Sequence, residues 1–179
     1  MQFVFLSLDP PKRVSVSISP SGKIVEGRSV TLTCNSDAKP PAQNNTWYKG
    51  TSSIGTGKTY TISSISSEDS GDYTCQAENI HGLQSSTAAS LNVLYPPKRV
   101  SVTISPSGEI VEGSSVTLSC SSDANPPAEY SWFKGISPKS NGKTYTIRKI
   151  SSEDRGAYKC KSSNQYGERY SDEVTIKVL

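Results

Sequence analysis

Long apolar segments and blocks of like charge are both missing from this chain of 179 residues. A membrane-spanning helix needs about 18 or more consecutive apolar residues, and no run here approaches that length. The 19 basic and 16 acidic residues are interspersed and give a net charge of only +3, unlike the clustered positive charge that binds nucleic acid. We therefore expect no nucleic-acid partner and no membrane insertion by this fragment, so that any anchor lies outside it.

Residues that carry catalysis and metal binding are also scarce. His81 is the only histidine, and its place in a short Asn-Ile-His-Gly loop indicates a solvated residue rather than the base of a catalytic triad. The four cysteines form no Cys-x-x-Cys pair, and a single histidine does little to complete a zinc site with them. Glycine-rich phosphate loops and calcium-loop patterns are absent as well. The sequence predicts no enzyme activity, no metal site and no cofactor.

The composition favours β-structure in small cores. Hydrophobic residues make up 33% of the chain, which is low for one large core, whereas two thin sandwiches with polar outer faces suit it. Serine, threonine, valine, isoleucine and tyrosine are plentiful, and no stretch keeps the 3.6-residue period of an amphipathic helix. We expect an all-β protein.

An internal repeat organises the chain. Residues 10–38 and 96–124 are identical at 24 of 29 positions, and the Gly-Lys-Thr-Tyr-Thr-Ile phrase at Gly57 returns at Gly142. Such self-similarity indicates two copies of one folding unit. The predicted boundaries are a domain over 10–94, a linker over 95–97 and a second domain over 98–179.

The repeat also bears on the cysteines. Four cysteines allow three pairings, and because each repeat contains two of them we expect Cys34 to pair with Cys75 and Cys120 with Cys160. Disulfides indicate an oxidising compartment. Closing a loop of about 40 residues stabilises a domain by roughly 4 kcal/mol, which is a large part of a typical folding free energy of about 5–15 kcal/mol.

Alternating polar and apolar residues mark the strands. Between Ser29 and Cys34 the alternation puts Val30, Leu32 and Cys34 on one face. Further strands of the first unit are expected at residues 14–19, 46–49, 59–65, 72–79 and 83–94.

Each unit carries the same constellation around its cysteines. Cys34 is followed 13 residues later by Trp47, and the second cysteine comes 28 residues after that, with Tyr73 two residues before it. Trp132 and Tyr158 hold the matching places in the second unit. This pattern resembles the immunoglobulin superfamily over nearly the whole chain. The resemblance implies that each tryptophan packs on the disulfide between two sheets and that each tyrosine hydroxyl bonds the backbone at a strand corner.

The stretch between Trp47 and Thr59 leaves no room for the extra edge strands of a variable-type domain, so both units resemble the short C2 type. A closer similarity is to the membrane-proximal repeats of Siglecs, sialic-acid-binding immunoglobulin-like lectins, and among them to the inhibitory Siglec of B cells. The phrases that carry it are Tyr95-Pro-Pro-Lys-Arg-Val, Ile110-Val-Glu-Gly-Ser, Ser122-Asp-Ala-Asn-Pro-Pro, Tyr130-Ser-Trp-Phe-Lys and Ser152-Glu-Asp-Arg-Gly-Ala-Tyr.

Siglecs bind sialylated glycans through a terminal variable-type domain, with an arginine on the strand that holds the second core cysteine in most immunoglobulin domains. Residues 73–77 and 158–162 contain no arginine, so lectin activity is not implied for either unit. The resemblance implies instead an extracellular spacer or adhesion segment of a single-pass cell-surface receptor, with neighbouring immunoglobulin domains as its partners. Two alternatives stay open: a module that binds cell-surface proteins or glycans directly, and a secreted decoy or structural repeat.

The joint between the units is expected to be short and stiff, because Pro96 and Pro97 follow Tyr95 and each proline fixes its own φ. Residues 1–9 are expected to be the remnant of a preceding strand or a leader-like segment.

Two surface features are candidate sites. Asn44 begins the only Asn-x-Ser/Thr glycosylation sequon and lies in a loop before Trp47. The second unit also has basic residues near its last strands, where the first has uncharged ones, and they are the candidate contact face if either unit binds an anionic partner. These residues are Lys159, Lys161, Arg169 and Lys177.

Overall fold

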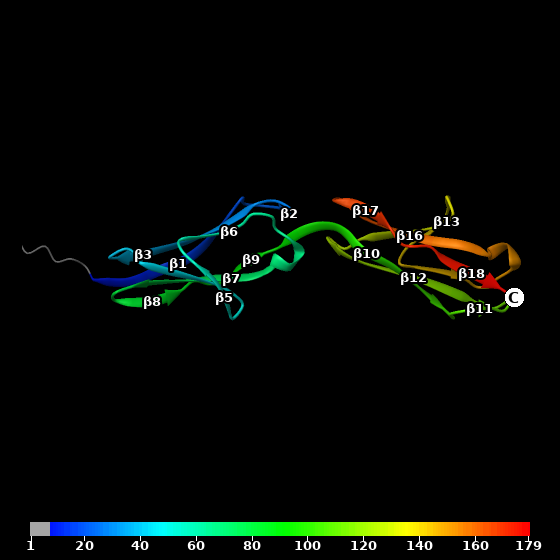
Figure 1. Ribbon diagram of the computed structural model, residues 1–179, viewed down its shortest axis with the longest axis horizontal. Coiled ribbons are helices and arrows are strands. Elements are labelled where there is room, and N and C mark those ends of the chain that lie inside the picture. The colour runs from blue at the N-terminus through cyan, green and yellow to red at the C-terminus, as the bar shows by residue number, and fades with distance from the viewer. Residues whose placement is uncertain (1–7) are drawn as a thin grey trace, which may run out of the picture. The chain divides into compact units, whose positions relative to one another are not determined.

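The computed structural model describes residues 8–179, and the chain divides into two compact units, Met1–Val93 and Leu94–Leu179. Each unit is a pair of facing layers of strands (Figure 1). The expected all-β sandwich architecture is confirmed. The strand remnant or leader expected at residues 1–9 falls almost wholly outside the described residues, and Asp9 is the first residue of β1.

Unit one has a three-stranded sheet of order β1-β3-β6, formed by Asp9–Ser19, Val30–Lys39 and Thr59–Ile62. All its pairs are antiparallel. The facing sheet has the order β5-β4-β7-β8, and β9 also pairs with β7. Its strands are β4 (Asn44–Lys49), β5 (Ser52–Thr56), β7 (Gly71–Asn79), β8 (Gly82–Ser85) and β9 (Ala89–Leu91). The short β2 (Ile24–Val25) pairs with β10 (Val93–Ser105), and the 3-10 helix η1 spans Ser67–Asp69.

Unit two repeats this plan. Its three-stranded layer is β10-β12-β15, with β12 at Val116–Asn125 and β15 at Thr144–Ile147. The facing sheet has the order β11-β18-β16-β13-β14, with β17 on β16. These strands are β11 (Glu109–Ile110), β13 (Glu129–Lys134), β14 (Ser137–Asn141), β16 (Gly156–Asn164), β17 (Gly167–Tyr170) and β18 (Val174–Val178), and η2 spans Ser152–Asp154.

One edge strand lies where the sequence predicted none. The stretch between Trp47 and Thr59 forms β5, which pairs with β4 through a bulge between Trp47 and Tyr48. A chain reversal at Gly50, where φ is +58°, is tight enough to fit a strand into so short a stretch. Unit two has β14 in the same place. The units therefore keep the short C2-type plan and carry one added edge strand each.

Alternation within the strands builds the cores. In β3 the residues Val30, Leu32 and Cys34 are each at most 3% exposed, because every second side chain points between the two sheets. The core of unit one also contains Val14, Ile24, Trp47, Ile65, Tyr73, Cys75, Ala77, Leu91 and Val93. The core of unit two contains Ile110, Val116, Leu118, Cys120, Trp132, Ile150, Tyr158, Cys160, Ile176 and Val178.

The residues expected to form a separate linker, Tyr95–Pro97, lie within β10. Val93 at the start of this strand is fully buried in the core of unit one, whereas Tyr95 already pairs with Asn125 of β12. Leu94 is the single residue between Val93 and Tyr95.

Glycines at the ends of two hairpins make room for prolines. A Cβ on Gly167 would lie 3.0 Å from the Cβ of Pro96, and one on Gly82 would lie equally close to the Cβ of Pro10. A distance of 3.0 Å is tighter than nine in ten real Cβ contacts, so the proline would have to shift by a few tenths of an ångström. Each hairpin therefore packs against the first strand of its own unit through a glycine.

Candidate functional site

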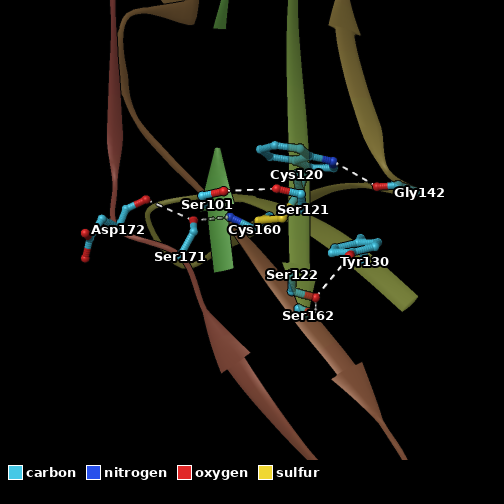
Figure 2. Close-up of a disulfide and its surroundings, with 11 residues drawn as sticks. Ser101, Cys120, Ser121, Ser122, Tyr130, Gly142, Cys160, Ser162, Ser171 and Asp172 are labelled. Atoms are coloured by element: carbon cyan, nitrogen blue, oxygen red, sulfur yellow. Dashed lines mark hydrogen bonds between the residues drawn. A yellow bond between two sulfur atoms is a disulfide. The ribbon is translucent and has the colours of Figure 1, made fainter. Parts of the chain in front are cut away.

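The disulfides tie the two layers of each unit together. In unit two, Cys120 of β12 is bonded to Cys160 of β16 (Figure 2). Trp132 lies opposite Cys160 in the strand register, is fully buried and donates its indole N–H to the Gly142 carbonyl at 3.0 Å. In unit one the disulfide joins Cys34 to Cys75, and Trp47 donates to the Gly57 carbonyl at 2.8 Å.

A tyrosine closes the corner before each second cysteine. The Tyr73 hydroxyl donates to the Asp69 carbonyl at 2.6 Å, and the Tyr158 hydroxyl donates to the Asp154 carbonyl at 2.8 Å. Burial raises the pKa of each tyrosine to about 12, and the negative charge of the aspartate at the same corner adds to the rise. Both tyrosines are essentially buried, so these groups stabilise the fold and take no part in surface recognition.

The lysines predicted to share a face in unit two do so. Lys159 and Lys161 alternate on β16 with buried residues, and Lys177 alternates on β18 with the buried Ile176 and Val178. Because successive side chains of a strand point to opposite sides, all three lysines lie on the outer side of this sheet.

Two aromatic rings join them there. Lys159 Nζ lies 4.6 Å from the centroid of the Tyr170 ring, and Phe133 meets Tyr170 edge to face at a centroid distance of 6.0 Å. Lys161 Nζ lies 3.1 Å from Glu168 Oε2, and the hydrogen bond and charge of this carboxylate raise the pKa of Lys161. We call this group the outer face of unit two; it consists of Phe133, Lys159, Lys161, Glu168, Tyr170 and Lys177.

Arg169 does not belong to this face, contrary to the prediction. It pairs with Ser162, whose side chain is fully buried between the layers. Paired residues of an antiparallel ladder point to the same side of the sheet, so Arg169 points away from the lysines. Sequence reasoning also missed the two aromatic residues. Phe133 could have been found from its place next to the inward Trp132.

The same face of unit one is chemically different. Tyr48 donates a hydrogen bond of 3.4 Å to Gln76 Oε1, and Gln76 Nε2 donates to Ser85 Oγ at 3.2 Å. Gln76 and Thr74 are the counterparts of Lys161 and Lys159. Among the described residues, a lysine over an exposed aromatic ring occurs on this face in unit two but not in unit one.

The units also differ in how one end of the sandwich is filled. Unit one has an open cavity of about 490 Å³ whose lining includes Ser36 and Asn45. In unit two Tyr130 takes the place of Asn45, and its hydroxyl lies 3.0 Å from Ser122 Oγ, which lies 2.7 Å from Ser162 Oγ (Figure 2). Unit two has a hollow of about 610 Å³ next to Tyr130, but no residue of β12 lines it. It is therefore not the counterpart of the cavity in unit one, which residues of β3 line.

The remaining candidate residues are at the surface. Asn44 is exposed and is the first residue of β4 rather than part of a loop. His81 is exposed in the turn between β7 and β8, where its backbone N–H donates to Asn79 Oδ1. Among residues 8–179 the acidic, histidine and cysteine side chains form no group of three that could hold a metal ion. In the same part of the chain no helix is long and apolar enough to cross a membrane.

Comparison with protein families and curated proteins identifies the domains. Models of the immunoglobulin domain match residues 10–79 and residues 100–178. Mouse B-cell receptor CD22 is 37% identical over 173 residues, which are 94% of this chain and 20% of CD22. Dog vascular cell adhesion protein 1 is 33% identical over 168 residues, 88% of this chain and 22% of that protein. The chain thus spans about a fifth of the length of these relatives.

Solved structures show the same fold. Sidekick-1 immunoglobulin domains 1–5 match with a TM-score of 0.65 at 18% identity, over 93% of this chain and 38% of that one. The N-terminal four immunoglobulin domains of Dscam1 isoform 7.44 match with a TM-score of 0.56 at 24% identity, over 93% and 46%.

The similarity to CD22 confirms the resemblance to a Siglec. Both units have the interlayer disulfide, the buried tryptophan and the tyrosine corner. With immunoglobulin models matched in both units, the chain belongs to the immunoglobulin superfamily.

Proposed function

We propose that this chain is an extracellular stalk segment of a cell-surface receptor or adhesion protein and that it holds a distal recognition domain away from the membrane. Similar proteins are named as a B-cell receptor and as adhesion molecules, and the chain corresponds to a minor part of each. Two copies of one folding unit in tandem suit a structure built by repetition. Its immediate partners would be the neighbouring immunoglobulin domains of the same receptor.

The joint between the units is the observation that carries this proposal. Val93 belongs to the core of unit one and Tyr95 to the ladder of unit two, so one residue, Leu94, separates two ordered positions. Two prolines follow at once, and a proline ring fixes φ near −65°. So short a connection supports a joint with little freedom to bend.

Tyr95 supports the same conclusion, because its side chain is held by unit two. Its hydroxyl donates a hydrogen bond of 2.6 Å to Asp123 Oδ1, and Lys98 Nζ lies 4.9 Å from the centre of its ring. A residue fixed at both backbone and side chain leaves fewer rotatable bonds at the joint than a free linker residue.

A domain exchange in the full-length receptor tests the stalk function. Replacing residues 10–179 with two unrelated immunoglobulin domains of equal size should leave binding of soluble ligand unchanged. Replacing them with a flexible linker of the same residue count should weaken adhesion between cells but again spare soluble ligand. Loss of soluble-ligand binding in both exchanges would contradict the stalk function and favour direct binding by these units.

The outer face of unit two supports a second candidate function, direct contact with an acidic partner. There Lys159 Nζ lies over the partly exposed Tyr170 ring, whereas the uncharged Thr74 and Ser85 hold the matching places in unit one. Lys159→Glu combined with Tyr170→Ala should abolish such contact, while Thr74→Glu, the matched change in unit one, should not. Equal binding by all three proteins would exclude this face.

A further inference from the structure

Asn44 lies on the outer face of unit one, in a row that crosses three strands. It pairs with Glu78 of β7, and Glu78 pairs with Leu83 of β8. Trp47 on β4 is fully buried, so Asn44, three residues earlier, points outward, as does Thr46 of the same sequon. Asn44 is exposed and can project a large group into solvent without disturbing the core.

Leu83 at the far end of this row is unusual for such a position. It is apolar and 53% exposed, whereas its ladder partner Glu78 and Asn44 beyond it are polar. Unit two has the corresponding row Glu129, Ser163 and Glu168. In this second row the sequon is absent, and Glu168 stands in the place of Leu83. The apolar residue therefore occurs in the unit that has the sequon.

We propose that Asn44 carries an N-linked glycan and that the glycan lies over Glu78 and covers Leu83. Neighbouring strands are about 4.8 Å apart, which puts Leu83 about 10 Å from Asn44 across the sheet, and the first two sugars of an N-linked glycan span that length. The apolar faces of these sugars then contact Leu83, while their hydroxyls keep the face soluble. The outer face of unit two stays bare.

The modification is a glycosyl transfer in the secretory pathway. The Asn44 side-chain nitrogen forms a bond to the anomeric carbon of a lipid-diphosphate-linked oligosaccharide. The bond from that carbon to the diphosphate oxygen breaks, the lipid diphosphate leaves, and the amide gives up one proton. The lipid-linked donor is the only co-reactant.

Mass spectrometry of the chain secreted from mammalian cells behind an added signal peptide tests the modification. We expect the intact mass to exceed that of the polypeptide by one N-glycan and the excess to vanish with peptide N-glycosidase F. Asn44→Gln and Thr46→Ala should each remove it, whereas Asn45→Gln, inside the sequon but not required by it, should keep it. Glu129→Asn creates a sequon with Tyr130 and Ser131 and should add a second glycan. An unmodified parent chain beside a modified Glu129→Asn variant would overturn the proposal.

The covering of Leu83 needs a separate measurement. Removing the glycan with Asn44→Gln should lower the melting temperature of unit one by a few degrees, as about 1 kcal/mol does in a domain of this size. The same change in a Leu83→Glu background should have little effect, because no apolar surface is left to cover. Equal losses in both backgrounds would contradict the contact. Neither test depends on the stalk function, since both use the secreted two-unit chain alone.

Discussion

Ionisation of the buried corner tyrosines should set the alkaline limit of stability of both units. The pKa of Tyr158 is about 12 in the folded chain and about 10 when the chain is unfolded. A pKa that folding raises means that the folded state favours the neutral phenol. The resulting stability is fully present below pH 10 and is lost as the pH rises through 12.

The magnitude follows from the shift. Each unit of pKa corresponds to about 1.4 kcal/mol, so the wild-type unit two should lose about 1.4 kcal/mol between pH 7 and pH 11 from this residue, and about 2.7 kcal/mol beyond pH 12. Tyr158→Phe removes the hydrogen bond to the Asp154 carbonyl, which costs about 1–2 kcal/mol at pH 7. The variant has no phenol to ionise there. The unfolding free energies of the Tyr158→Phe variant and the wild type should therefore become about equal near pH 11.

Urea unfolding followed by far-ultraviolet circular dichroism at pH 7 and pH 11 measures this gap. The difference between the two proteins reports on the Tyr158 hydroxyl together with its electrostatic coupling to Tyr145. Tyr73→Phe should behave the same way in unit one, where the raised pKa is also about 12. A gap that stays constant between the two pH values would refute the link between burial of the hydroxyl and alkaline unfolding.

Three further changes have expected outcomes in urea unfolding. Replacing Cys34 and Cys75 together by alanine should destabilise unit one by about 4 kcal/mol, because the loop between them is no longer closed in the unfolded chain. The unfolding transition of unit two should stay unchanged. A shift of both transitions would contradict independent unfolding of the two units. Tyr130→Asn should open in unit two the cavity seen in unit one and cost about 2–4 kcal/mol, and an unchanged midpoint would show that the Ser122 contact adds nothing. Gly167→Ala should cost about 1–3 kcal/mol, because its Cβ would press on Pro96 and its φ of +158° disfavours a side chain. Gly108→Ala, where a Cβ meets nothing, should cost only the backbone strain that a side chain adds at a φ of +89°.

The sequence was sufficient for the fold because the decisive residues lie on strands with strict alternation. The alternate spacing of Val30, Leu32 and Cys34 predicts which side of their strand is buried. The internal repeat assigns one pair of cysteines to each unit. The edge strand β5 was missed because its residues, Ser52–Thr56, include a single large apolar side chain, Ile54, and show no alternation. Its pairing depends on the turn at Gly50, which a sequence pattern does not reveal.

The outer face of unit two was predictable only in part. Lys159 and Lys161 follow the alternation of β16, so their direction could be read from the buried cysteine between them. Arg169 lies beyond a hairpin, and its direction depends on the register in which β17 pairs with β16. A shift of one residue in that register would have put it beside the lysines. The cavity near Asn45 likewise becomes visible only when Tyr130 is seen to fill the same place.

Small-angle scattering of the two-unit chain tests the proposed stiff joint most directly. A joint with little freedom to bend should give the parent chain a narrow distribution of distances between the two units. Inserting Gly-Ser-Gly-Ser after Leu94 should broaden the distance distribution and lower its mean. A parent chain whose distribution is already as broad as that of the insertion variant would contradict the account.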